Sequence, residues 1–106
     1  MRIQLLTFDG CPHHEQARIL LERALASKGR REWQIENTIV DETSVALLKF
    51  PGSPTIRVNG RDVEPGFNDP GVYTLTCRVY RTKEGLLGYP ASEWIEQAIG
   101  ESDARN

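Results

Sequence analysis

Apolar and polar positions along the chain follow two different periods. Residues 3–8 form a short apolar run that ends at Asp9-Gly10, which predicts a buried first strand. Over residues 12–29 the apolar positions instead recur at helical spacing, which predicts one amphipathic helix. Its apolar stripe is made of Ala17, Leu20, Leu21, Ala24 and Leu25. Residues 33–40 return to alternation and predict a second strand.

Proline and glycine divide the second half of the chain into short elements. Asp41 can cap a helix, and the Asn59-Gly60 pair is typical of a tight hairpin turn. The predicted elements are, in order, a short helix over 41–48, a strand over 54–58, a hairpin at Asn59-Gly60, a loop over 65–72, a half-buried strand over 73–80 and a closing helix over 91–99.

The resulting order, β-α-β-α-β-β-α, predicts an α/β protein. A crossover helix joins the first two strands, so we expect them to lie parallel. Helices are then expected on both faces of a small mixed β-sheet. The whole arrangement forms a single domain over residues 1–100, and residues 101–106 are expected to be a flexible C-terminal tail.

Composition and charge exclude several classes of protein. A chain of 106 residues is long enough to bury a core without disulfides or a structural metal. Its net charge of -2 and its pI of about 5.7 argue against binding of nucleic acid. The polar N-terminus predicts no signal peptide and no membrane partner, and hence a cytoplasmic protein. In such a reducing compartment, two cysteines suit catalysis, metal binding or inert burial better than a structural disulfide.

Two short motifs carry the candidate chemistry. Cys11-Pro12 lies where the first strand meets the first helix, and the sequence Gly-Ser-Pro-Thr at residues 52–55 precedes the third strand. With the order of elements, these motifs resemble the thioredoxin family over residues 2–100. The stretches FDGCP, GSPTIRVNGRD and CRVYRTKEGLLG are similar to small bacterial members of that family.

The resemblance implies a thioredoxin-like fold and a site built from both motifs. Pro54 is then a cis-proline that faces Cys11, and Ser53, Pro54 and Thr55 are substrate-binding residues. The substrate class that it implies is a thiol or disulfide, on a protein or on a small molecule.

Cys11 has the sequence context of a reactive cysteine. The thiolate is the nucleophile, and the free N–H groups and dipole of a helix N-terminus favour an anion. Pro12 suits the first turn of a helix, and His14 adds a donor close to the thiol. The alternative is a purely structural role, in which Cys11 is an unreactive cysteine that packs at a helix end. We therefore take Cys11, Pro12 and His14 as candidate catalytic residues.

The second cysteine of a Cys-x-x-Cys motif is missing, because His14 occupies its position. A dithiol cycle through residues 11 and 14 is excluded, since an imidazole cannot resolve a mixed disulfide. Three routes stay open. Glutathione or another low-molecular-weight thiol could act as cosubstrate, Cys77 could act as a distant resolving thiol, or Cys11 could bind a ligand without turnover.

Cys77 has two interpretations. It alternates in phase with Tyr73, Leu75 and Val79, which predicts a small buried hydrophobe on the core face. Alternatively it belongs to the catalytic residues as the partner of Cys11. Cys11 and His14 share a helix face and could bind zinc or copper, but two ligands are too few, so we expect no metal site and no resident cofactor.

The sequence thus predicts a monothiol redox protein, a candidate thiol–disulfide oxidoreductase in which Cys11 attacks and either a small thiol or Cys77 resolves. The alternative is a non-catalytic binding module of the same fold, for a soft metal, an organomercurial or a protein partner.

Overall fold

The computed structural model describes residues 1–31 and 34–104, and it is a mixed α/β structure. Trp33, at the start of the predicted second strand, lies outside these residues. The elements along the chain are β1 (Ile3–Phe8), α1 (His14–Ser27), β2 (Ile35–Val40), β3 (Thr55–Val58), β4 (Arg61–Asp62), β5 (Tyr80–Thr82), β6 (Gly85–Leu87) and α2 (Ser92–Ala104).

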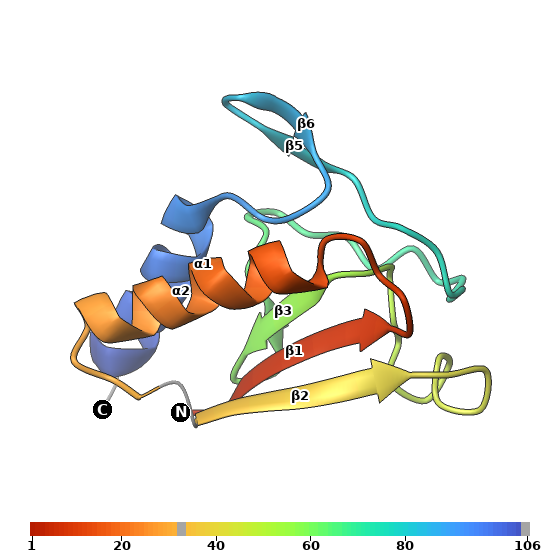
Figure 1. The fold of residues 1–106 in the computed structure, drawn as a ribbon, viewed down its shortest axis with the longest axis horizontal. Coiled ribbons are helices and arrows are strands. Elements are labelled where there is room, and N and C mark those ends of the chain that lie inside the picture. The colour runs from red at the N-terminus through yellow and green to blue at the C-terminus, as the bar shows by residue number, and fades with distance from the viewer. Residues whose placement is uncertain (32–33, 105–106) are drawn as a thin grey trace.

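The central sheet has the strand order β2-β1-β3-β4 (Figure 1). Strands β1 and β2 are parallel, with Ile3 opposite Ile35, so the predicted crossover through α1 is confirmed. Strand β3 runs antiparallel to β1 and pairs Leu6 with Thr55. The Asn59-Gly60 turn, with both residues at positive φ, joins β3 to β4 as the predicted hairpin.

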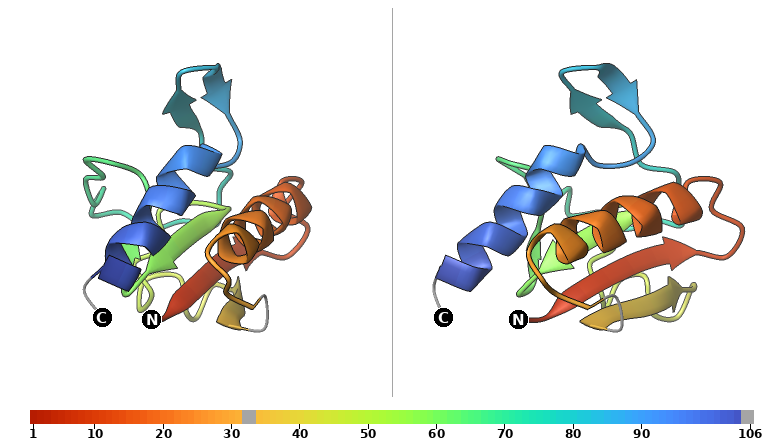
Figure 2. Two further views of the ribbon diagram at one scale, coloured as in Figure 1. Left: turned by 90° about the vertical axis from the view of Figure 1, so that its left-hand side faces the viewer. Right: turned by 60° about the vertical axis from the view of Figure 1, so that its left-hand side comes forward.

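Both helices cover the same face of the sheet (Figures 1 and 2). The main core lies between them and the sheet. It is formed by Ile3, Leu5, Ala17, Leu21, Ala24, Leu25, Ile56, Val58, Val63, Ile95 and Ile99. The expectation of helices on both faces is wrong, since in the described part of the chain the opposite face has no helix and carries a smaller cluster around Leu6, Val40 and Phe50.

The predicted helix over residues 41–48 is wrong, and the element order is therefore not β-α-β-α-β-β-α. The residues that start a helix and those that end it are too close together in this segment for a helix to form. The Asp41 carboxylate accepts hydrogen bonds from the N–H groups of Thr43 and Ser44, as at a helix start. Phe50 already donates its N–H to Val45 O, and Lys49 has a φ of 51°, which ends the turns.

The predicted strand over residues 73–80 is also wrong, because only a single bridge at Cys77 and the first residue of β5 are extended and paired. Strand β5 pairs with β6 in a two-stranded hairpin that the sequence did not predict. This hairpin stands apart from the central sheet, beyond the end where α2 begins (Figure 2).

Helix α2 extends past the predicted end at Ile99 and into the segment that was expected to be a tail. It continues to Ala104, and Ser102 is only 5% exposed. The side-chain amide of Asn59 donates to Ser102 Oγ at 2.7 Å, so a polar contact from the β3–β4 turn holds the last turns of the helix.

Candidate functional site

Cys11 lies in the turn between β1 and α1, and it is partly exposed. Its N–H donates to Phe8 O at 3.2 Å, and its carbonyl accepts from the His14 N–H at 3.4 Å. Pro12 is an exposed residue of this turn. The helix begins at His14 with His13 as its N-cap, so it starts two residues later than predicted. Cys11 therefore lies just before the helix N-terminus rather than within its first turn.

Ser53 connects the second motif to the strand that leads into Cys11. The Ser53 hydroxyl accepts a hydrogen bond from the Phe8 N–H at 3.3 Å. The Ser53–Pro54 peptide bond is cis, as the resemblance implies. Ser53 and Thr55 are 1% and 0% exposed. The Thr55 hydroxyl donates to Gly52 O at 2.6 Å, so both side chains are already bonded within the chain.

Cys77 lies beside Ser53, on the side away from β1. Ser53 donates its N–H to Thr76 O at 2.8 Å, and its carbonyl accepts from the Arg78 N–H at 2.9 Å, which makes a parallel bridge between Ser53 and Cys77. Cys77 is exposed, and both cysteines are free thiols. Residues 76–78 of the protein itself thus occupy the main-chain hydrogen-bonding groups of Ser53, and Cys77 is the middle residue of this segment.

The predicted burial of Cys77 is wrong because the alternation has the opposite phase. Arg78 and Tyr80 are 8% and 0% exposed, whereas Val79 is 64% exposed. Arg78 turns inward because its guanidinium pairs there with the buried Asp62 carboxylate and the partly buried Glu64 carboxylate. Its partners come from β4 and the following turn, which a pattern of local alternation cannot reveal.

A buried ion-pair network holds Arg78 under the Cys77 segment. The guanidinium binds both Asp62 oxygens, at 2.6 and 3.0 Å, and one Glu64 oxygen at 3.1 Å. It also donates to Thr55 Oγ1 at 2.9 Å. Burial is the largest single effect and works against its charge, but the hydrogen bonds to Asp62 and Glu64 and the charges of Asp62 and Tyr80 together outweigh it and hold the pKa of Arg78 above its usual value.

Aromatic rings enclose the same guanidinium. The Arg78 Cζ atom lies 4.9 Å from the centre of the Phe67 ring and 4.3 Å from that of Tyr80. Burial raises the pKa of the Tyr80 phenol, whose hydroxyl donates to the Pro54 carbonyl. Arg78 and Tyr80 therefore connect residues 53–55 and β4 to the segment that contains Cys77. Sequence reasoning gave neither residue a role, although both stand in the polar phase of residues 73–80.

The two histidines contribute different contacts. The His13 ring lies 5.8 Å from the Tyr89 ring, centre to centre, and it fills the space beside Gly88 where a Cβ atom would otherwise point. His14 is partly buried in the first turn of α1. Within residues 1–31 and 34–104, no group of three or more His, Cys, Asp or Glu side chains is placed to hold a metal ion.

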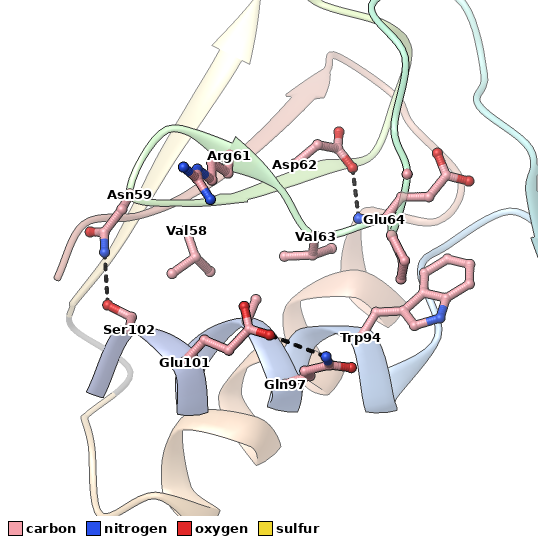
Figure 3. Close-up of a pocket in the computed structure, with 13 residues that line it drawn as sticks. Val58, Asn59, Arg61, Asp62, Val63, Glu64, Trp94, Gln97, Glu101 and Ser102 are labelled. Carbon is pink, nitrogen blue, oxygen red and sulfur yellow. Dashed lines mark hydrogen bonds between the residues drawn. The ribbon is translucent and has the colours of Figure 1, made fainter. Parts of the chain in front are cut away.

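A cavity of about 530 Å³ lies between the β3–β4 hairpin and α2 (Figure 3). Its polar rim includes the Asn59–Ser102 and Gln97–Glu101 hydrogen bonds, and Trp94 closes one end (Figure 3). Neither cysteine and neither histidine lines it. Cys11 and Cys77 thus lie outside this cavity.

Gly52 provides a first testable prediction about this site. It has a φ of 135°, and a Cβ atom there would lie 2.9 Å from the Cβ of Arg78. We expect Gly52→Ala to lower the free energy of unfolding by about 1–3 kcal/mol, through backbone strain and displacement of residues 76–78. Urea denaturation measures the loss. The control is Gly66→Ala, which has a φ of 70° but open space around it; an equal loss in both variants would contradict the close-packing argument.

Comparisons with models of known families, with curated proteins and with solved structures found no match for this chain. In the part of the chain that the structure describes, we also find no helix with the length and apolar character needed to cross a membrane.

Proposed function

We propose that the protein is a thioredoxin-like thiol–disulfide redox protein in which Cys11 attacks and Cys77 resolves. The observation that carries the proposal is the position of Ser53. Its hydroxyl bonds to the strand that leads into Cys11, and its main chain bonds to the segment that contains Cys77. The two free thiols thus belong to segments held on either side of one buried residue.

The remaining architecture is compatible with a thioredoxin-like fold that lacks one helix. The β1-α1-β2 unit is parallel, β3 is antiparallel to β1, and Pro54 immediately precedes β3. The helix that the resemblance implies between β2 and β3 is replaced by turns. A fold of this kind would present Cys11 at the C-terminal end of β1, where the preceding turn leaves it partly exposed.

The proposed reaction has two steps and moves two electrons. The Cys11 thiolate attacks a sulfur of the substrate disulfide, a mixed disulfide forms, and the first substrate thiol leaves. The Cys77 thiolate then attacks the Cys11 sulfur, the second substrate thiol leaves, and a Cys11–Cys77 disulfide forms. The substrate disulfide is reduced and the protein dithiol is oxidised. In the cytoplasm, where we place the protein, low-molecular-weight thiols would reduce it again.

The exposure of Cys77 favours this route over resolution by a small thiol. A resolving thiol must approach the Cys11 sulfur, and an exposed cysteine on an irregular segment can do so more readily than a buried core residue. The main-chain groups of Ser53 are already bonded to residues 76 and 78. The ligand that Ser53 positions is therefore, in this proposal, the resolving segment itself.

Cys77→Ser tests the assignment of the resolving thiol. Without Cys77 the second step cannot occur, so incubation with glutathione disulfide is expected to leave one glutathione attached at Cys11, as seen by mass spectrometry of the intact protein. The wild-type protein is expected to lose two hydrogens and keep no glutathione. If the wild-type protein instead retains glutathione as fully as the variant, Cys77 does not resolve and a small thiol must. If Cys11 forms no adduct at all, the protein is a binding module.

A further inference from the structure

A second cavity lies on the sheet face that no helix covers. It has a volume of about 710 Å³ and extends from the end of the turns at residues 47–49 to the loop at residues 66–69. Gln4 and Arg57, which are partners across β1 and β3, form part of its floor. Because side chains alternate along a strand, these residues point away from the helix-covered core that contains Leu5 and Ile56.

Arg57 is a partly buried cation with no carboxylate partner among residues 1–31 and 34–104. Its guanidinium donates to Lys49 O at 2.9 Å, and it forms no ion pair with any residue that the structure describes. Burial lowers the pKa of Arg57, and the positive charge of Arg78 adds to this effect, while Asp62 partly offsets it. A bound anion would replace the lost hydration of this guanidinium and would use its remaining N–H donors.

The other charges around the cavity divide into paired and unpaired groups. Asp62 and Glu64 are engaged by Arg78, and Arg2 pairs with Glu36 at 2.9 Å. Lys49 and Arg61 also line the cavity, and neither has an ion-pair partner among the described residues.

One carboxylate competes for these cations. Asp69 accepts hydrogen bonds from the Tyr73 hydroxyl at 2.6 Å and from the Gly71 N–H at 2.8 Å. These bonds, with smaller effects of Lys49 and Arg57, lower the pKa of Asp69, so it is a charged neighbour of any anion that binds.

Apolar side chains complete the lining. Leu47, which is 85% exposed, lies at the edge with Leu48, and Phe67 contributes from the opposite loop. We propose that this cavity, the Arg57 groove, binds a small organic anion, a carboxylate or a phosphate monoester that carries an apolar ring or chain. The anionic group contacts Arg57 and Lys49, and the apolar part covers Leu47, Leu48 and Phe67.

Titrations followed by amide NMR test the Arg57 groove with three probes: phenylacetate, phenyl phosphate and the neutral phenylethanol. We expect at least one of the two anions to shift the amide signals of residues 47–49 and 57 in a saturable way, and phenylethanol to bind at least about tenfold more weakly. Phenylacetate binding more tightly identifies carboxylates as the ligand class, and phenyl phosphate binding more tightly identifies phosphate monoesters. Equal binding of phenylethanol, or no saturable shift with any probe, would overturn the proposal.

Three variants locate the binding. Arg57→Gln is expected to weaken anion binding about tenfold, and Asp69→Asn to strengthen it about threefold because a competing charge is removed. Arg23→Gln, an exposed position on α1, is the matched control and should leave the affinity unchanged. An Arg57→Gln protein that binds as tightly as the Arg23→Gln protein would refute the site. These measurements do not involve either thiol, so their outcome is independent of the redox proposal.

Discussion

Arg78→Met is expected to lower the free energy of unfolding by about 3–5 kcal/mol, because it leaves the buried Asp62 carboxylate without its ion-pair partner. The Arg78 and Asp62 side chains are only 7% and 3% exposed, so water cannot replace the lost ion pair. A total stability of about 5–15 kcal/mol is usual for a domain of this kind, so the variant should be largely unfolded in moderate denaturant. Urea denaturation followed by circular dichroism measures the change.

Two further variants separate the ion pair from simple loss of packing. Asp62→Asn added to Arg78→Met removes the stranded charge, so the double variant should regain part of the lost stability. Arg81→Met, on the exposed side of the β5–β6 hairpin, should change the stability by less than about 0.5 kcal/mol. If Arg78→Met were as stable as Arg81→Met, the network could not be what holds residues 76–78 against Ser53.

The second large effect is expected at Cys11. Cys11→Ser should abolish the complete reduction of glutathione disulfide to two glutathione molecules by the protein, since a serine hydroxyl cannot form a disulfide and Cys77 alone can at most form a mixed disulfide. The protein should nevertheless remain folded with nearly unchanged stability, because residue 11 is a partly exposed turn residue that forms hydrogen bonds through its main chain. Reaction rates followed by thiol quantification, together with a denaturation curve, check both parts. Full activity of Cys11→Ser would show that Cys77 acts without it.

His14→Cys in a Cys77→Ser background is the matched gain-of-function control. It restores a thiol three residues after Cys11, at the position where a Cys-x-x-Cys motif resolves its own mixed disulfide. We expect this double variant to release the glutathione that Cys77→Ser retains. Persistent retention would mean that the turn before α1 holds residue 14 out of reach of the Cys11 sulfur.

The first half of the fold could be predicted from the sequence because its signals are local and repeated. The apolar stripe of α1 and the parallel pairing of β1 with β2 follow from the change of period near residue 12. The Asn59-Gly60 hairpin follows from the conformational preference of two residues. The predicted helix at 41–48 does not form, because its start signal at Asp41 and the stop signal after it are too close together for a helix of several turns.

The candidate site was only partly accessible to the same reasoning. Cys11 and Ser53 stand next to sequence signals for strand and helix ends, so their neighbourhood could be anticipated. The exposure of Cys77 could not, because alternation fixes which residues share a face but not which face is buried. That choice depends on the bond from Arg78 to Asp62, whose two residues are 16 positions apart in the chain.

We propose that Cys11 and Cys77 form one redox pair. The most direct test is peptide mapping of the wild-type protein after mild oxidation, with free thiols trapped before digestion and no reductant added. We expect a cross-linked peptide that joins Cys11 to Cys77 within one molecule and disappears on reduction. Recovery of both cysteines as trapped free thiols, or of Cys11 joined only to a small thiol, would contradict it.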